Sequence, residues 1–304
     1  MRIFLTGATG YIGSAVLDAL LRASHQVTAL VRTPQTAHAM ALRGVVTVLG
    51  DLAAVKPHLE AANGFDAYIH TAAASTAKRE EIDRGALDAL LGAASAHAET
   101  SATAFVYTSG IWVLGSDAQP MTETAQPNPG PLLGWRVGHE QRVLQAAGKN
   151  LRTAVIRPGI VYGGSRGIVS DLLKNAVNGL IRVIGDGQNH WPLIYHRDLA
   201  DLYARVATQA QAAGIYHAND EADETVNTIV EGIVNHCSMP PDVRHVPLDE
   251  ARKKLGGYAD ALALDQRVRS ARAHALGWSP ALHSVSANIP RLLEEFRRGN
   301  ERAA

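Results

Sequence analysis

Short apolar runs alternate with amphipathic stretches along the first half of the chain. The apolar runs, which are typical of β-strands, lie at 2–7, 26–32, 45–51, 65–72, 103–110 and 152–163. The stretches that predict helices lie between them, at 11–24, 34–42, 80–97 and 135–147. Strands this apolar, separated by helices, predict an α/β fold in which a parallel sheet is covered by helices on both faces.

The pattern changes after residue 163. Helices are predicted at 167–180, 224–237, 249–263, 265–275 and 289–304, and short strands at 214–220 and 243–248. Residues 181–208 predict a β-turn-β element that runs into a helix. Because these pieces interleave closely with the first half, we expect a core at 1–163 with a small lobe, mostly 164–304, packed on it rather than an independent domain.

Charge and composition exclude several classes of partner. The 304 residues include 29 Lys and Arg against 29 Asp and Glu, so neither nucleic acid nor an anionic membrane is expected as a partner. No stretch approaches the roughly 18 apolar residues that span a bilayer, and the N-terminal apolar run is too short for a secretory signal, so we expect a cytoplasmic protein. The single cysteine, Cys237, fits a reducing compartment and predicts a core thiol, with no metal site.

A glycine motif, "GATGYIG", joins the first predicted strand to the first predicted helix. Gly7 permits the tight turn, Gly10 lets the backbone approach a pyrophosphate, and Gly13 lets the helix pack closely on the sheet. The helix N-terminus then offers free N–H groups and a partial positive charge to the phosphates. The motif therefore predicts a dinucleotide-binding core of the Rossmann type, a doubly wound parallel sheet. We expect the C-terminal lobe to bind the substrate, with a cleft between the lobe and this core.

The end of the second predicted strand distinguishes the two nicotinamide cofactors. An acidic residue there would accept hydrogen bonds from the ribose hydroxyls of NAD(H). This strand ends in Arg32 with no acid nearby, and a guanidinium would attract a 2′-phosphate. The sequence therefore favours NADP(H), with NAD(H) as the alternative if Arg32 is merely solvated.

The glycine spacing and later landmarks together resemble the extended branch of the short-chain dehydrogenase/reductase family, the NAD-dependent epimerase/dehydratase group. The landmarks are "GDL" at 50–52, "HTAAA" at 70–74, "FVYTSGIWVLG" at 105–115, "IRPGIVYG" at 156–163, "GDGQNHWPLIYHRDLADLY" at 185–203 and "ALGWSP" at 275–280. With the glycine motif and Arg32, the resemblance implies cofactor contacts at Gly7, Thr9, Gly10, Tyr11, Ile12, Gly13, Arg32, Asp51, Leu52, Thr71, Ala72, Ala73, Thr108, Arg136, Pro158, Gly159, Ile160 and Val161.

The chain departs from this family at the catalytic helix. The family carries Tyr-x-x-x-Lys there, but residues 130–148 read "GPLLGWRVGHEQRVLQAAG" and hold neither tyrosine nor lysine. Anchoring on the Glu-Gln pair at 140–141 puts Arg136 at the lysine and Leu132 at the tyrosine. We prefer this register because Arg136 could keep the lysine's contact with the ribose, although arginine cannot exchange a proton.

Anchoring instead on Gly115 puts Trp135 at the tyrosine and His139 at the lysine. The family's Ser or Thr position then falls on Gly110, beside Thr108 and Ser109. In either register the family's tyrosine is absent. The catalytic candidates are Ser109, Arg136 and His139, and His139 could equally be a packing residue. The candidates for substrate contact are Trp112, Tyr162, His190 and Trp191.

These features predict an NADP(H)-dependent reductase or dehydrogenase that transfers hydride to or from a small carbonyl or alcohol. Proton transfer would fall to a nonstandard group or to water, at a cost of about 10² to 10⁴ in rate. One alternative is a non-catalytic NADP(H)-binding redox sensor, and another is a nucleotide-sugar epimerase, whose oxidation and re-reduction depend even more on the missing base. By analogy, helix 135–147 is a candidate homodimer contact.

Overall fold

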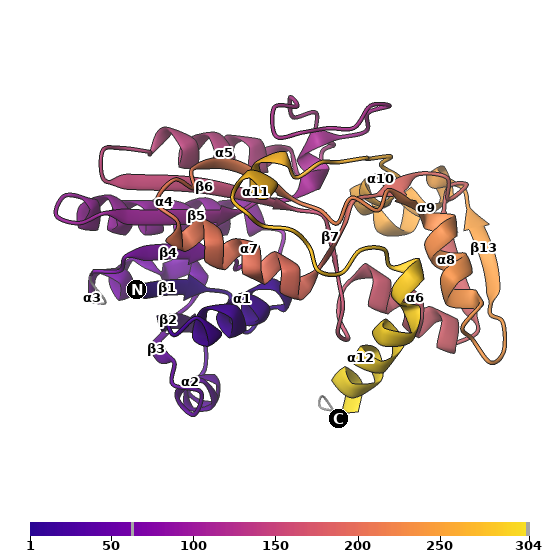
Figure 1. The fold of residues 1–304 in the computed structure, drawn as a ribbon, viewed down its shortest axis with the longest axis horizontal. Coiled ribbons are helices and arrows are strands. Elements are labelled where there is room, and N and C mark those ends of the chain that lie inside the picture. The colour runs from indigo at the N-terminus through magenta and orange to yellow at the C-terminus, as the bar shows by residue number, and fades with distance from the viewer. Residues whose placement is uncertain (62–63, 302–304) are drawn as a thin grey trace.

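The structure is a computed structural model, and it describes residues 1–61 and 64–301. Its centre is a seven-stranded sheet in which every neighbouring pair is parallel (Figure 1). In spatial order the strands are β3 (Val46–Leu49), β2 (Gln26–Val31), β1 (Arg2–Thr6), β4 (Ala67–His70), β5 (Thr103–Thr108), β6 (Leu151–Pro158) and β11 (Gly214–Ala218). The chain order reverses between β1 and β4, which creates the crevice at the strand ends where this class of sheet binds ligands.

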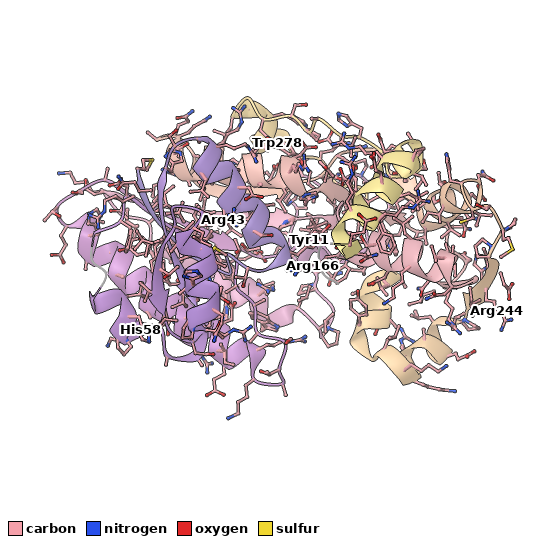
Figure 2. All side chains as sticks on the ribbon, turned by 90° about the horizontal axis from the view of Figure 1, so that it is seen from below. Tyr11, Arg43, His58, Arg166, Arg244 and Trp278 are labelled. Carbon is pink, nitrogen blue, oxygen red and sulfur yellow. The ribbon has the colours of Figure 1, made fainter. Side chains whose placement is uncertain are left out.

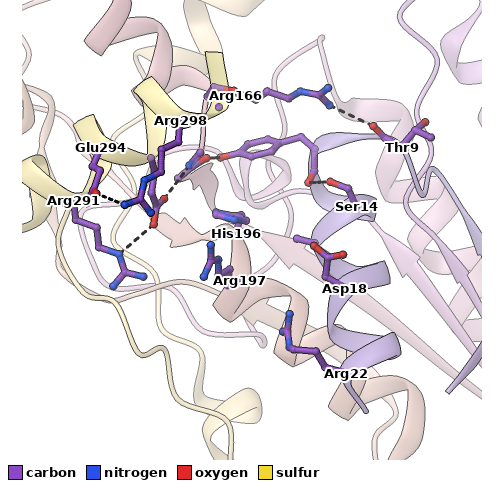
Figure 3. A pocket seen from close by; sticks show the side chains of 17 residues that line it. Thr9, Ser14, Asp18, Arg22, Arg166, His196, Arg197, Arg291, Glu294 and Arg298 are labelled. Carbon is purple, nitrogen blue, oxygen red and sulfur yellow. Dashed lines mark hydrogen bonds and ion pairs between the residues drawn. The ribbon is translucent and has the colours of Figure 1, made fainter. Parts of the chain in front are cut away.

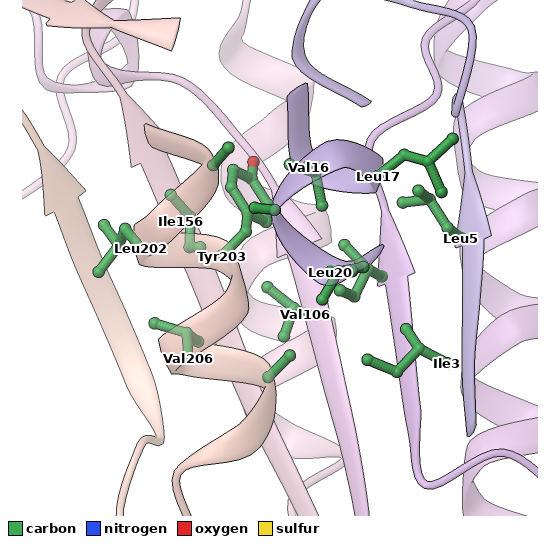
Figure 4. Close-up of a cluster of buried hydrophobic side chains, with 14 of the residues drawn as sticks. Ile3, Leu5, Val16, Leu17, Leu20, Val106, Ile156, Leu202, Tyr203 and Val206 are labelled. Carbon is green, nitrogen blue, oxygen red and sulfur yellow. The ribbon is translucent and has the colours of Figure 1, made fainter. Parts of the chain in front are cut away.

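Helices cover both faces of the sheet, as the apolar pattern predicts. Helices α1 (Tyr11–Arg22) and α7 (His196–Thr208) pack on one face against alternate strand residues such as Ile3, Val106 and Ile156 (Figure 4). Helices α4 (Arg79–Ala98) and α5 (Gly134–Gln145) cover the other face, where Phe105 and Tyr107 are fully buried. Two short helices, α2 (Pro34–Ala41) and α3 (Lys56–Ala61), follow β2 and β3. The α/β prediction is confirmed.

The remaining elements gather at one end of the sheet, at the right of Figure 1. The helices there are α6 (Ile168–Val177), α8 (Val226–Val234), α9 (Leu248–Leu255), α10 (Gly257–Leu262) and α12 (Ile289–Glu301). The strands are β7 (Ile160–Tyr162), β8 (Leu180–Ile184), β9 (His190–Trp191), β10 (Leu193–Tyr195), β12 (Glu224–Thr225) and β13 (Asp242–Val246). All of these elements except α9 and β12 contribute to a second apolar cluster. Elements α7, β11 and α11 (Ala271–Ala275) return from the second half of the chain to the sheet.

One predicted strand is in fact two. The run at 152–163 divides into β6, in the central sheet, and β7, which pairs with β10. Pro158 ends β6 because it has no N–H to donate. At Gly159 a Cβ would lie 2.6 Å from the Pro192 carbonyl oxygen, so a bare backbone is needed where the chain crosses between the sheets.

The predicted β-turn-β element at 181–208 has the expected order of strand, turn, strand and helix, but it is not a hairpin. β8 pairs with β13, β9 with β12 and β10 with β7, so the strands on the two sides of the turn do not pair with each other. The glycines at 185 and 187 both have positive φ and turn the chain between them. The helix that follows the element, α7, begins at His196.

Two predicted helices near the C-terminus are shorter than expected. The one at 249–263 is broken at Gly256, whose φ of 56° ends α9 and precedes α10. Of the one at 265–275, only α11 is helical, because the preceding residues pair with the segment near Met121. The end of the predicted tail helix, at 302–304, lies outside the described residues. Within residues 1–61 and 64–301, no helix combines the length and the apolar character that crossing a bilayer requires.

Candidate functional site

The glycine turn brings α1 into backbone contact with its neighbours. Gly7 has a φ of 79°, and a Cβ there would lie 2.6 Å from the Ala72 amide nitrogen. A Cβ on Gly13 would lie 2.1 Å from the Gly7 carbonyl oxygen. Gly10 precedes α1 and contributes no side-chain cap, so the first N–H groups of the helix face the crevice without a side-chain acceptor from that position. The turn is therefore a cradle that only glycine permits.

A first cavity, of about 340 Å³, opens on one side of this turn. Its wall comes from the glycine turn and from the ends of β2, β3 and β4. Of the predicted cofactor contacts it brings together Gly7, Thr9, Gly10, Arg32, Asp51, Leu52, Thr71, Ala72 and Ala73. Arg32 is exposed at this cavity, while one oxygen of Asp51 accepts the Ala53 N–H at 2.8 Å.

A second cavity, of about 310 Å³, lies against the residues that open α1. The predicted site residues that line it are Tyr11, Ile12, Ser109, Trp112, Arg136, Pro158, Gly159, Ile160 and Val161. Gly110, Ile111, Leu133, Gly167 and Ile168 complete the wall. The two cavities thus adjoin the glycine motif at consecutive positions, the first at Gly10 and the second at Tyr11, as a dinucleotide laid across the helix N-terminus requires.

Arg136 is fixed at the edge of the second cavity. Its Nη1 atom donates to the hydroxyl of Tyr107 at 3.1 Å and to the Thr108 carbonyl oxygen at 2.9 Å. Its guanidinium also lies over the Trp135 ring, 4.5 Å from the centroid. Leu132, at the tyrosine position in the register we prefer, lies in the turn before α5 begins. The chain therefore presents a fixed cation on the helix and no phenol at that position.

Ser109 lines the same cavity, and its buried hydroxyl is unpaired. Its residue is 8% exposed, its backbone N–H donates to Ile156, and its Oγ has no hydrogen-bond partner among the described residues. A buried hydroxyl without a partner is unfavourable unless something else completes it. Thr108, by contrast, turns its hydroxyl to Tyr203, 2.6 Å away. Of these two neighbouring hydroxyls, that of Ser109 is therefore the unpaired one.

His139 lies in a buried polar cluster behind Arg136 and does not line either cavity. Its Nδ1 atom is 2.8 Å from Oδ2 of Asp83, which also accepts from Tyr107 at 2.7 Å. Nε2 of His70 is 3.5 Å from the other Asp83 oxygen. Burial alone would raise the pKa of Asp83, but the bonds to His139 and His70 and the charge of Arg136 outweigh it and lower the pKa.

The predicted substrate contacts separate in space. Trp112 lines the second cavity and Trp191 lines another one in the lobe. Tyr162 is fully buried and donates to Asp220 and Leu282, both at 3.1 Å. His190 pairs with Asp265 at 2.7 Å and lines neither the second cavity nor the one at Trp191.

Sequence reasoning missed Tyr107, Asp83 and Arg166. The signal available for Asp83 was its position as an acid on a helix face whose other residues are apolar. Arg166, in the loop after β7, donates to the Thr9 carbonyl oxygen at 3.4 Å and reaches the glycine turn from the outside. Figure 2 places it beside Tyr11, where the sheet domain and the lobe meet.

Arg166 belongs to a polar cavity of about 810 Å³ on the outer side of α1 (Figure 3). Its charged lining residues are Asp18, Arg22, Arg166, Arg197, Arg291, Glu294, Glu295 and Arg298. Most of these groups are already paired, Asp18 with Arg43 and Glu294 with Arg298, while Glu295 accepts from Arg291 and the Tyr195 hydroxyl. Of the predicted site residues this cavity contains Thr9 and Tyr11 alone.

Known proteins resemble this chain over the region that forms both cavities. The family described as the NAD dependent epimerase/dehydratase family matches residues 3–218. The uncharacterized protein C2A9.02 of Schizosaccharomyces pombe is 30% identical over 301 residues, which cover 95% of this chain and 98% of that protein. A 2-alkyl-3-oxoalkanoate reductase of Stenotrophomonas maltophilia is 30% identical over 227 residues, 70% of this chain and 67% of the reductase.

A solved structure extends the likeness to the whole chain. Human epimerase family protein SDR39U1, solved with NADPH, matches with a TM-score of 0.75 at 20% sequence identity. The match covers 97% of this chain and 99% of the human one. At this identity the likeness is one of fold.

Proposed function

Because the chain belongs to the NAD dependent epimerase/dehydratase family, the group that its motifs resemble, we propose that it is an NADP(H)-dependent reductase or dehydrogenase of a small carbonyl or alcohol. The observation that carries the proposal is the unpaired, buried hydroxyl of Ser109 in a cavity that also holds Arg136. This polar pair shares the cavity with Pro158–Val161 and with Tyr11 and Ile12 at the start of α1, where the reacting end of a dinucleotide would lie.

The residues present fit such a cofactor. The cradle at Gly7 and Gly13 leaves no room for a Cβ, so a glycine turn is retained where a diphosphate would contact the backbone. Arg32 at the first cavity supports NADP(H) over NAD(H), since an exposed guanidinium can pair with a 2′-phosphate. When bound, the nicotinamide supplies or accepts the hydride.

Ser109 and Arg136 would act on the substrate oxygen. In the reducing direction, Ser109 donates a hydrogen bond to the carbonyl, and Arg136 stabilises the negative charge that develops on its oxygen. Arginine keeps its proton, so water supplies the proton that completes the alcohol. The name of the Stenotrophomonas relative, a reductase of a 3-oxo compound, supports the reducing direction.

One observation favours the alternative of a redox sensor. The titratable side chains that line the second cavity are Tyr11 and Arg136. Tyr11 donates its hydroxyl proton to the Gly163 carbonyl oxygen at 2.7 Å, and burial raises its pKa, so it is a poor proton donor to a ligand. A sensor would bind NADPH and leave every carbonyl compound unchanged.

The test follows NADPH absorbance with a panel of aldehydes and ketones, in the protein and in two variants. Turnover with at least one carbonyl is expected. Because Arg136 would also hold the nicotinamide ribose, as the family's lysine does, Arg136→Ala should weaken NADPH binding by about 1 to 3 kcal/mol, the scale of charged hydrogen bonds. The matched control is Arg142→Ala on the same helix, where the exposed guanidinium pairs with Asp88. Tight NADPH binding without turnover across the panel would favour the sensor.

A further inference from the structure

A third cavity, of about 420 Å³, lies inside the lobe between α6, β8, α9 and α10. Its wall is largely apolar and includes Leu172, Val183, Trp191, Val226, Val246, Ala251 and Leu262. The indole N–H of Trp191 donates to the Leu262 carbonyl oxygen at 2.9 Å, so the ring's one polar group is already paired. What this wall offers a ligand is mainly hydrocarbon surface.

The third cavity adjoins the second. Ile168, the first residue of α6, lines both. Trp112 from the second cavity packs edge-on against Tyr258 from the third, with ring centroids 5.9 Å apart. Ile168 and the Trp112–Tyr258 contact therefore lie at the boundary between the two cavities. A ligand held at Ser109 would reach the third cavity by passing Ile168.

The charged groups of the third cavity balance one another. Arg182 and Lys254 are matched by Asp171 and Glu250. A nucleotide sugar carries a diphosphate with at least two negative charges, which calls for an excess of cations in its binding site. The charge balance argues instead for an uncharged, apolar occupant.

We propose that the substrate is a carbonyl compound, or the matching secondary alcohol, with a hydrocarbon tail that occupies the third cavity. This inference rests on the proposed function, because the second cavity must hold the reacting carbonyl. In the reducing direction, a hydride from NADPH forms the new C–H bond, the C=O double bond becomes a single bond, and water gives its proton to the oxygen. The products are the alcohol, NADP⁺ and hydroxide.

The tail subsite predicts a dependence on chain length. Each methylene that moves from water into the apolar cavity should raise kcat/KM about three- to fourfold, until the cavity is filled. The measurement compares methyl ketones from 2-butanone to 2-dodecanone with saturating NADPH. A value of kcat/KM that does not rise with chain length would overturn the proposal.

Ala251→Phe fills the third cavity from α9 and is the test variant, since Ala251 is 4% exposed and lines that cavity. It should lower the ratio of kcat/KM for 2-decanone to that for 2-butanone by at least tenfold. Leu255→Phe, at a more exposed position on the same wall, serves if the first variant does not fold. The control is Val177→Trp, at an exposed position on α6, which should leave the ratio unchanged. An equal ratio in the wild type and the filled variants contradicts the assignment.

A binding measurement separates this proposal from the proposed function. Calorimetry with 2-decanone in the presence of NADP⁺ requires no turnover. If no ketone is reduced but 2-decanone binds the wild type and not Ala251→Phe, the tail subsite stands and the reductase assignment fails. If 2-butanone is reduced and 2-decanone binds no better than 2-butanone, the tail subsite fails and the reductase assignment stands. If 2-decanone does not bind and no ketone is reduced, both assignments fail.

Discussion

The hydroxyl of Tyr107 joins Arg136 to Asp83: it accepts from Nη1 of Arg136 at 3.1 Å and donates to Oδ2 of Asp83 at 2.7 Å. Tyr107 is fully buried and Asp83 is 3% exposed. The carboxylate thus fixes the direction of the phenolic proton and leaves the oxygen lone pair facing the guanidinium. A buried acid with no direct contact to the cavity thereby orients the cation at its edge.

Tyr107→Phe should therefore act through Arg136. Losing the acceptor should weaken NADPH binding by about 1 to 3 kcal/mol, the scale of a hydrogen bond to a charged group. The measurement is a double-mutant cycle on the NADPH dissociation constant, with Tyr107→Phe, Arg136→Ala and the pair. In the Arg136→Ala background Tyr107→Phe should have little further effect. Additive losses would show that Tyr107 acts on binding independently of Arg136, and no loss in Tyr107→Phe would show that Tyr107 contributes to stability alone.

Arg32→Ala tests the choice of cofactor. Removing the guanidinium should lower the affinity for NADPH by about 1 to 3 kcal/mol and leave that for NADH nearly unchanged, because only NADPH carries the 2′-phosphate. Both dissociation constants can be measured by nicotinamide fluorescence. Equal losses for the two dinucleotides would reject the 2′-phosphate contact.

Ser109→Ala tests the hydrogen bond to the substrate oxygen. The variant should lower kcat by about 10² to 10³, as removal of one donor to a developing oxyanion does elsewhere, and should leave the NADPH affinity unchanged. The readout is steady-state kinetics on the ketone that the protein reduces fastest. Ser101→Ala, in the exposed turn before β5, is the control. An unchanged kcat in Ser109→Ala would remove Ser109 from the mechanism.

The titration of Asp220 should make the free energy of unfolding depend on pH. Burial raises its pKa from 3.8 to about 7, although the Ala222 N–H and the Tyr162 hydroxyl oppose the shift. Between those values the folded protein keeps a proton that the unfolded chain has lost. Its contribution to the free energy of unfolding therefore falls as the pH rises from about 4 to about 7, and is constant above that.

Asp220→Asn removes this titration. From pH 5 to pH 8, the stability of the variant relative to the wild type should rise by about 1 to 3 kcal/mol. Burial lowers the pKa of His217 to about 3, which changes stability in the opposite direction, but equally in both proteins. Urea unfolding at the two pH values measures the difference. The control is Asp242→Asn, at a half-exposed carboxylate, whose stability should change with pH as that of the wild type does. The same behaviour in Asp220→Asn would contradict the prediction.

The glycine turn could be predicted from sequence because its requirements are local. Three glycines within seven residues, between a strand and a helix, describe one turn completely. The division between β6 and β7 could not be predicted, because the apolar pattern continues through Gly159. The strand that pairs with β7, β10, lies about 30 residues away in the sequence. Strand pairing depends on which backbone is nearby, and the side-chain pattern is the same for either sheet.

The catalytic candidates show the same limit. Spacing along a helix places His139 near Arg136, and both do lie beside Tyr107. Helical spacing does not show which neighbour each side chain contacts. His139 contacts Asp83 on α4, and Arg136 lines the second cavity. The orientation of these side chains depends on residues more than 50 positions away in the sequence, such as Asp83 on α4.

Binding of nicotinamide dinucleotides to the glycine turn tests the central claim most directly. Calorimetric titration of the wild-type protein should detect one NADPH per chain, bound more tightly than NADH. Gly13→Ala should bind neither, because its Cβ would lie 2.1 Å from the Gly7 carbonyl oxygen and displace the turn. A folded wild-type protein that binds neither NADPH nor NADH would contradict the account.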